Sequence, residues 1–133
     1  MKAYEDSRVD SLDDLARDIN LWAAGKGFND IPPALDRLCK ASLEVDSYVT
    51  AAVKGQKIAL FHSEASELLE GLRSKHNTLI EVDAQLSNEE EELADLIIRA
   101  LHYAGQYGLR IGKAVQMKMA KNEARPHKHG KEF

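Results

Sequence analysis

Apolar residues recur at intervals of three and four along almost the whole chain, and this spacing places them on one face of an α-helix. The segment LADLIIRALHYAGQY is a clear example, because its apolar residues follow this spacing without a break. No segment shows the alternation of β-branched and polar residues that is typical of strands. The sequence therefore predicts an all-α protein built as a bundle of four to five helices.

Capping residues, glycines and prolines divide this pattern into separate helices. We expect helices over residues 11–25, 33–55, 56–73, 88–107 and 111–122. Ser11 would cap the first helix, and Ser87 with Glu90 forms a capping box at the start of the fourth. Gly55 either separates the second helix from the third or bends one long helix.

The composition suits a single domain over residues 1–133. With 44% hydrophobic residues and one cysteine, its stability must come from an apolar core rather than from disulfides. The fourth helix is apolar around so much of its circumference that a homo-oligomer is expected, either a homodimer or a homotetramer. No apolar run reaches the ~18 residues that a membrane span needs, and the charged N-terminus does not resemble a signal peptide. We therefore expect a cytoplasmic protein.

Charge is distributed unevenly around a net value of -4. Residues 89–92 are all acidic, whereas basic residues gather in the C-terminal part, including an irregular tail over about residues 123–133. Such a basic segment suits nucleic acid or a smaller anion such as a phosphate chain. Segments that bind single-stranded nucleic acid interleave aromatic residues with basic ones, and this tail has only Phe133. Nucleic acid is therefore the less favoured partner.

Two pairs of acidic residues with a spacing of three lie on separate expected helices, namely Glu64 with Glu67 and Glu92 with Asp95. On a helical wheel of about 100° per residue, Glu64 borders the apolar face and Glu67 lies just beyond it. The second pair lies farther from its own apolar face. Two such helices could surround one cavity, where clustered carboxylates repel one another unless cations neutralise them. A ligand set made of oxygen atoms alone favours Mg²⁺ or Mn²⁺.

Simpler interpretations of these acids stay open. Acidic residues at a helix start complement the helix dipole, which accounts for residues 89–91. Glu64 and Glu67 alone are as compatible with a solvated flank as with a metal site. A di-iron bundle is disfavoured because it requires Glu-x-x-His elements, and neither His62 nor His102 has that spacing. Both histidines are expected to be surface or boundary residues.

Three segments together are similar to motifs of the MazG-like nucleoside triphosphate pyrophosphohydrolases, an all-α family with small forms in bacteria and phages. HSEASELLEGL resembles the first acidic motif, EELADLI resembles the second, and KMAKNEARPHKHGKEF resembles the C-terminal signature. Each segment alone is a weak signal, and their combination and order between Ile58 and Phe133 are quite specific. The chain departs from the family at Ser63, where a second Glu often precedes the acid of the first motif.

The resemblance implies hydrolysis of a ribo- or deoxyribonucleoside triphosphate to the monophosphate and pyrophosphate. It implies metal ligands at Glu64, Glu67, Glu92 and Asp95. Our candidate for the base that activates water is Glu67, although the sequence does not distinguish a base from a metal ligand. It implies phosphate contacts at Lys118, Asn122 and Arg125. The segment INLWAAGKGF is similar to a helix on which a Trp lies near the base, so Asn20 and Trp22 are candidate base contacts. A role for Trp22 in the core or in an oligomer interface remains an alternative.

Two other functions fit the same sequence. One is a non-catalytic helical interaction module whose basic tail binds nucleic acid. The other is a related helical phosphohydrolase that acts on another phosphorylated metabolite. For the pyrophosphohydrolase itself, both the clearing of aberrant nucleotides and the adjustment of a nucleotide pool during phage replication are compatible roles.

Overall fold

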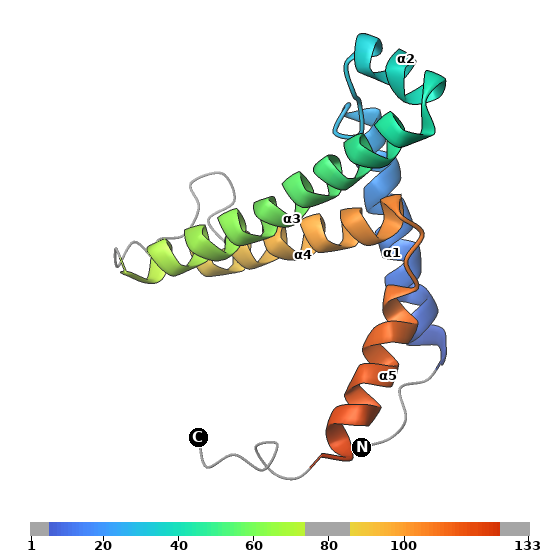
Figure 1. The fold of residues 1–133 in the computed structure, drawn as a ribbon. Helices are drawn as coiled ribbons and strands as arrows, with labels where there is room; N and C mark the ends of the chain where they lie inside the picture. The colour runs from blue at the N-terminus through green and yellow to red at the C-terminus, as the bar shows by residue number, and fades with distance from the viewer. Residues whose placement is uncertain (1–5, 74–85, 126–133) are drawn as a thin grey trace.

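The computed structural model describes residues 6–73 and 86–125. These ranges contain five helices: α1 (Asp6–Gly25), α2 (Pro33–Ala41), α3 (Leu43–Arg73), α4 (Asn88–Gln106) and α5 (Ile111–Glu123) (Figure 1). No strand occurs within them, so the expected all-α class is confirmed. Among the same residues, none of the helices has the length and apolar character needed to cross a bilayer.

The helices form an open, branched arrangement (Figure 1). α3 and α4 pack side by side and run in opposite directions, and α2 packs on the first part of α3. α1 crosses the end of α4, and α5 packs on α1 and extends away from the α3–α4 pair. The free ends of α5 and of the α3–α4 pair therefore point in different directions.

The small core lies where α1 crosses α4. Ala16 of α1 is buried against Leu101 and Ala104 of α4, and three further side chains pack on this cluster: Leu12, Ile19 and Ile111. At Gly105 the helices are so close that a Cβ atom would overlap the backbone carbonyl oxygen of Ala16. Small residues at the crossing therefore set the distance between α1 and α4.

Two of the expected helix boundaries are wrong. α1 begins at Asp6, so Ser11 lies inside the helix and not at its N-cap. The break between the second and third helices lies at Ser42 and not at Gly55. Ser42 has an extended backbone (φ −147°, ψ 117°), and its Oγ accepts a hydrogen bond from the Val45 N–H at 3.4 Å. Gly55 is an interior residue of the uninterrupted, 31-residue α3.

The capping box at the start of α4 is confirmed. The Glu90 N–H donates to Ser87 Oγ at 3.2 Å, and the Ser87 N–H donates to Glu90 Oε2 at 2.7 Å. These two bonds satisfy backbone groups that have no partner inside the helix. The pKa of Glu90 is lowered, because the Ser87 N–H and the Ser87 hydroxyl, the latter at 2.8 Å, both donate to Glu90 Oε2 and favour the charged carboxylate. α4 therefore begins where the local sequence predicts.

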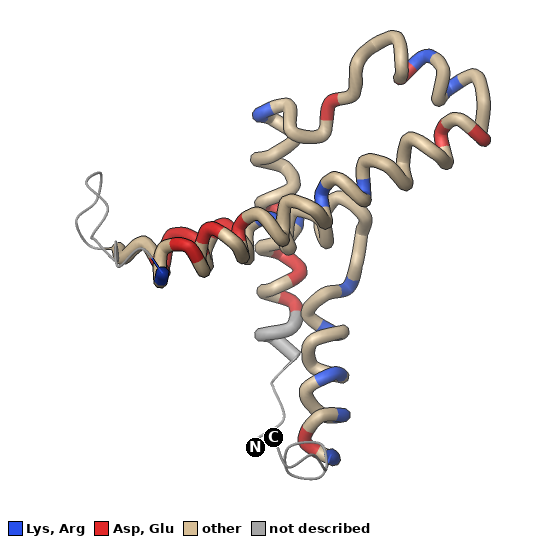
Figure 2. The backbone as a smooth tube through the Cα atoms, turned by 60° about the vertical axis from the view of Figure 1, so that its left-hand side comes forward, with Lys and Arg blue, Asp and Glu red and all other residues tan. Residues whose placement is uncertain are grey.

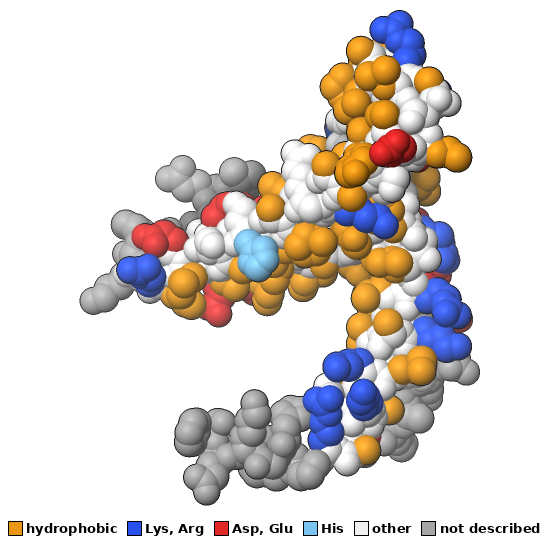
Figure 3. Space-filling view, in the orientation of Figure 1, with side chains coloured by type: hydrophobic (Ala, Val, Ile, Leu, Met, Phe, Trp, Pro, Cys, Tyr) orange, Lys and Arg blue, Asp and Glu red, His pale blue; other side chains and the backbone are white. Residues whose placement is uncertain are grey.

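The expected apolar face of the third helix is not buried within one chain. Ile58 and Leu72 are exposed, and the buried residue of α3 is Glu64. Apolar side chains also spread over the surface that faces the viewer in Figure 3. The reason is that along this part of α3 the packing partner is α4, which covers only one flank of the helix.

Candidate metal centre and adjoining cavity

Three carboxylates converge between α3 and α4. Glu64 and Glu67 lie one turn apart on α3, and Glu92 reaches them from the neighbouring α4. Each offers an oxygen atom that lies within 4.8 Å of those offered by the other two. Figure 2 shows the acidic residues of both helices along the same part of the pair. The structure therefore brings together three of the four predicted metal ligands.

Glu64 is the most enclosed member of the group, with 3% of its surface exposed. A buried carboxylate is costly unless a positive charge or a hydrogen bond compensates it. Here the Arg99 guanidinium of α4 pairs with Glu64 Oε1. Glu64 was expected beside the apolar face of its helix, and the structure buries it; its pairing with Arg99 was not predicted.

Glu67 and Glu92 differ in their surroundings. Glu67 is exposed, and its Oε1 accepts a hydrogen bond from Ser63 Oγ at 3.0 Å. The pKa of Glu92 is raised, first because burial removes water from the carboxylate and then because the negative charges of Glu67 and Glu64 lie nearby. A cation bound to these three carboxylates would compensate for the lost hydration and would neutralise the repulsion between them. The donors are hard oxygen atoms, which suit Mg²⁺ or Mn²⁺.

Asp95 lies outside this three-residue cluster. It is exposed, one turn after Glu92, and its side chain lines a cavity of about 670 Å³. Arg99 lines the same cavity while it pairs with Glu64. The carboxylate cluster and the cavity therefore adjoin, and a metal-binding role for Asp95 stays a prediction.

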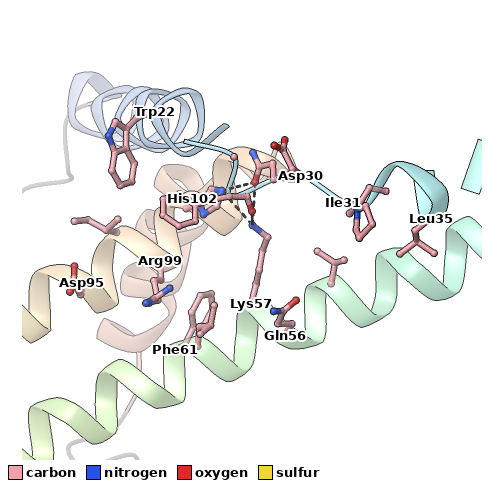
Figure 4. Close-up of a pocket in the computed structure, with 17 residues that line it drawn as sticks. Trp22, Asp30, Ile31, Leu35, Gln56, Lys57, Phe61, Asp95, Arg99 and His102 are labelled. Atoms are coloured by element: carbon pink, nitrogen blue, oxygen red, sulfur yellow. Dashed lines mark hydrogen bonds between the residues drawn. The ribbon is translucent and has the colours of Figure 1, made fainter. Parts of the chain in front are cut away.

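Aromatic side chains form part of the cavity wall (Figure 4). The rings of Trp22 and Phe28 lie 5.9 Å apart between centroids, and Phe61 of α3 contributes a third ring. Trp22 is 54% exposed, so it is not a core residue of the single chain. Open apolar walls of this kind suit a flat ring that stacks on them.

A polar group spans the cavity between α3, α4 and the loop after α1. Lys57 Nζ lies 3.2 Å from Asn29 Oδ1 and 3.5 Å from the Phe28 carbonyl oxygen. His102 Nε2 lies 2.8 Å from the same Asn29 oxygen, and Asn29 Nδ2 donates to Asn20 Oδ1 at 3.0 Å. Asn20 is not among the residues that line the cavity; it holds Asn29, which is, and its role as a base contact stays a prediction. Burial lowers the pKa of Lys57, and burial together with the positive charges of Lys57 and Arg99 lowers that of His102.

Sequence reasoning missed Lys57, Arg99 and His102 as site residues. Each is seven residues, or about two helical turns, from a predicted acid: Lys57 from Glu64, Arg99 from Glu92 and His102 from Asp95. The spacing of seven was available in the sequence and could have extended the candidate site along both helices.

The predicted phosphate ligands are placed elsewhere. Lys118, Asn122 and Arg125 are exposed on α5 or just after its end. The start of α5 is anchored to α1, because the Gly112 N–H donates to Asp13 Oδ1 at 2.8 Å. α5 leads these residues away from the acidic part of α3 and α4 (Figure 2). One chain does not bring them to the carboxylates, and their role stays a prediction. The rest of the basic tail, residues 126–133, lies outside the described residues.

Comparisons with protein-family profiles, with characterised proteins and with solved structures give no match.

Proposed function

We propose that this protein is a metal-dependent pyrophosphohydrolase of the MazG-like type, which cleaves a nucleoside triphosphate to the monophosphate and pyrophosphate. The observation that carries the proposal is the convergence of Glu64, Glu67 and Glu92 within 4.8 Å, beside a cavity with aromatic walls. The acidic group suits divalent cations, and the cavity suits a nucleobase. The similarity of three sequence segments to the family motifs supports the same function.

Glu64, Glu67 and Glu92 would hold Mg²⁺ or Mn²⁺, with Asp95 as the adjacent fourth ligand. When bound, the metal would neutralise the phosphate charge and increase the acidity of a coordinated water. Glu67 suits the role of the base that accepts a proton from the attacking water, because it is the most exposed of the three and Ser63 orients it. Attack at the α-phosphorus would expel pyrophosphate.

Arg99 would act between the two parts of the site. Its guanidinium pairs with Glu64 and lines the cavity, so it lies between the carboxylates and the proposed base pocket. Once cations neutralise Glu64, the forked guanidinium is available to the phosphate oxygens that approach the carboxylates. The side chain is 40% exposed, which leaves it room to move.

We infer that a second copy of the chain completes the site. Lys118 and Asn122 lie one turn apart on the exposed surface of α5, which extends away from the carboxylates of its own chain. The exposed apolar side chains of α3 and α4, among them Ile58, Leu72 and Ile97, are suited to burial against a partner. An antiparallel dimer could place α5 of one chain at the carboxylates of the other.

The direct test is an assay of purified protein with a panel of common and modified nucleoside triphosphates, in the presence of Mg²⁺ or Mn²⁺, with products separated by chromatography. We expect equal amounts of monophosphate and pyrophosphate, and none without metal. Glu92→Gln should abolish the reaction, whereas Glu89→Gln, which removes an exposed acid from the first turn of α4, should leave it intact. Release of inorganic phosphate in place of pyrophosphate would identify a different phosphohydrolase.

A further inference from the structure

The hydrogen bonds around Asn29 determine which atoms donate. Lys57 has N–H donors only, so the Asn29 atom that it contacts at 3.2 Å must be the amide oxygen. This orientation agrees with the Asn29 Nδ2 donating to Asn20 Oδ1. The amide oxygen cannot donate, so His102 Nε2, at 2.8 Å, must carry the proton. A lowered pKa favours the neutral ring, and Nδ1 then has no proton.

This assignment leaves one hydrogen of Lys57 without an acceptor among the described residues. The ammonium group has three N–H bonds, and its acceptors there are Asn29 Oδ1 and the Phe28 carbonyl oxygen. His102 Nε2 is 3.5 Å away, but it is itself a donor and cannot accept. Lys57 lines the cavity and points toward His102 in Figure 4. A partly buried donor without a partner costs free energy that a ligand acceptor can recover.

We propose that Lys57, held by Asn29, selects nucleobases that carry a ring carbonyl and disfavours adenine. A base that stacks on the aromatic wall of Trp22 and Phe28 would direct its edge toward Lys57. A carbonyl there accepts the remaining N–H, whereas adenine places its amino group, a donor, at that position and has only the ring nitrogens N1 and N7 as acceptors on that edge. The proposal rests on the proposed function, the hydrolysis of a nucleoside triphosphate, and adds the class of base that the protein prefers.

The test measures binding without turnover. Trp22 is the only tryptophan of the chain and lies in the cavity, so its fluorescence reports occupancy. We would titrate the protein with dIMP, dTMP and dAMP. dIMP and dAMP are matched in size. They differ at position 6, which is a carbonyl in dIMP and an amino group in dAMP, and at the adjacent N1, which is a donor in dIMP and an acceptor in dAMP. Wild-type protein should bind dIMP and dTMP at least about 10-fold more tightly than dAMP.

Lys57→Met should reduce this preference to about two-fold or less, because it keeps the length of the side chain and removes the donor. Lys54→Met is the matched control: Lys54 lies one turn earlier on α3, with its ammonium over the Tyr107 ring. This control should keep the wild-type preference. Circular dichroism of both variants verifies that the helices are retained.

Three results would overturn the proposal: equal binding of dIMP and dAMP to the wild type, a preference that survives Lys57→Met, or no binding of any monophosphate. The comparison of dIMP with dAMP uses wild-type protein, so the proposal can be tested even if Lys57→Met does not fold. If dIMP and dAMP bind equally and nucleoside triphosphates are hydrolysed, the pyrophosphohydrolase function stands and the base preference is refuted. A preference for carbonyl bases without any hydrolysis would support the base preference and refute the pyrophosphohydrolase function.

Discussion

Arg99 of α4 pairs with the buried carboxylate of Glu64 on α3 and lines the cavity as well. This contact joins the two parts of the proposed site, since Glu64 belongs to the carboxylate cluster and Arg99 to the cavity wall. The arginine supplies the positive charge that a buried carboxylate requires. Removing that charge has consequences for stability as well as for catalysis.

Arg99→Met should lower the free energy of unfolding by about 1–3 kcal/mol, because Glu64 keeps its burial and loses its partner. Adding Glu64→Gln to this variant should restore part of the loss, since the buried charge is then also gone. Urea denaturation of the wild type, both single variants and the double variant measures this coupling. Mg²⁺ should stabilise Arg99→Met more than the wild type. Additive single effects would show that the two side chains do not interact in solution.

Stability should depend on pH through Glu92. Its pKa is raised in the folded protein, so the unfolded chain loses this proton at lower pH than the folded one. Ionisation of Glu92 therefore destabilises the fold as pH rises from the ordinary glutamate pKa through the raised value. In denaturation series from acidic to neutral pH without metal, Glu92→Gln should weaken this decline and Glu89→Gln should not. If Glu92→Gln shows the same dependence of stability on pH as the wild type, Glu92 is not the group that causes the decline.

Substitution by alanine should change the stability of the protein in opposite directions at two glycines. Gly105→Ala places a Cβ against the Ala16 carbonyl oxygen, and we expect a loss of about 1–3 kcal/mol as α1 and α4 are forced apart. Gly55→Ala meets no atom within 4 Å in the middle of α3 and should stabilise the protein by about 0.5–1 kcal/mol. Thermal and chemical denaturation measure both. A destabilising Gly55→Ala would mean that α3 is not continuous there.

A site shared between two copies should be restored by mixing defective chains. Glu92→Gln removes a carboxylate of the cluster and Lys118→Met removes a proposed phosphate contact, so a homodimer of either variant should be inactive. After the two are refolded together, half of the dimers are mixed and each has one intact site, so activity should recover to about a quarter of the wild type. Glu92→Gln refolded with Glu64→Gln is the control and should recover nothing. If Glu92→Gln mixed with Lys118→Met recovers no activity, either Glu92 and Lys118 act in a site formed by one chain, or Lys118 does not belong to the site.

Local signals in the sequence were sufficient for some features and not for others. The capping box at Ser87 depends on contacts within one turn, and it forms as expected. Gly55 was a poor indicator of a helix end, because one glycine costs a long helix only about 1 kcal/mol. Ser42, with its local hydrogen bond to the Val45 N–H, marks the actual boundary. Turn chemistry was therefore more informative here than the position of a glycine.

The candidate site was predicted in part. The spacing of the acids placed Glu64 beside the apolar face of its helix, and α4 brings Glu92 close to it. Arg99 and Lys57 were missed because their roles depend on how α3, α4 and the loop after α1 pack together. A helical wheel describes one helix in isolation and gives no information on this packing. The exposed apolar face of α3 has a related cause, since a wheel indicates which face is apolar and not which neighbour covers it.

The most direct measurement of the central claim follows a single turnover in water labelled with heavy oxygen, with Mg²⁺ and a nucleoside triphosphate. If the carboxylates of α3 and α4 hold metal ions that promote attack at the α-phosphorus, the label will enter the monophosphate and the pyrophosphate will be unlabelled. The reaction will fail in Glu92→Gln and proceed in Glu89→Gln. Label in the released phosphate or pyrophosphate, or turnover without a divalent ion, would contradict the account.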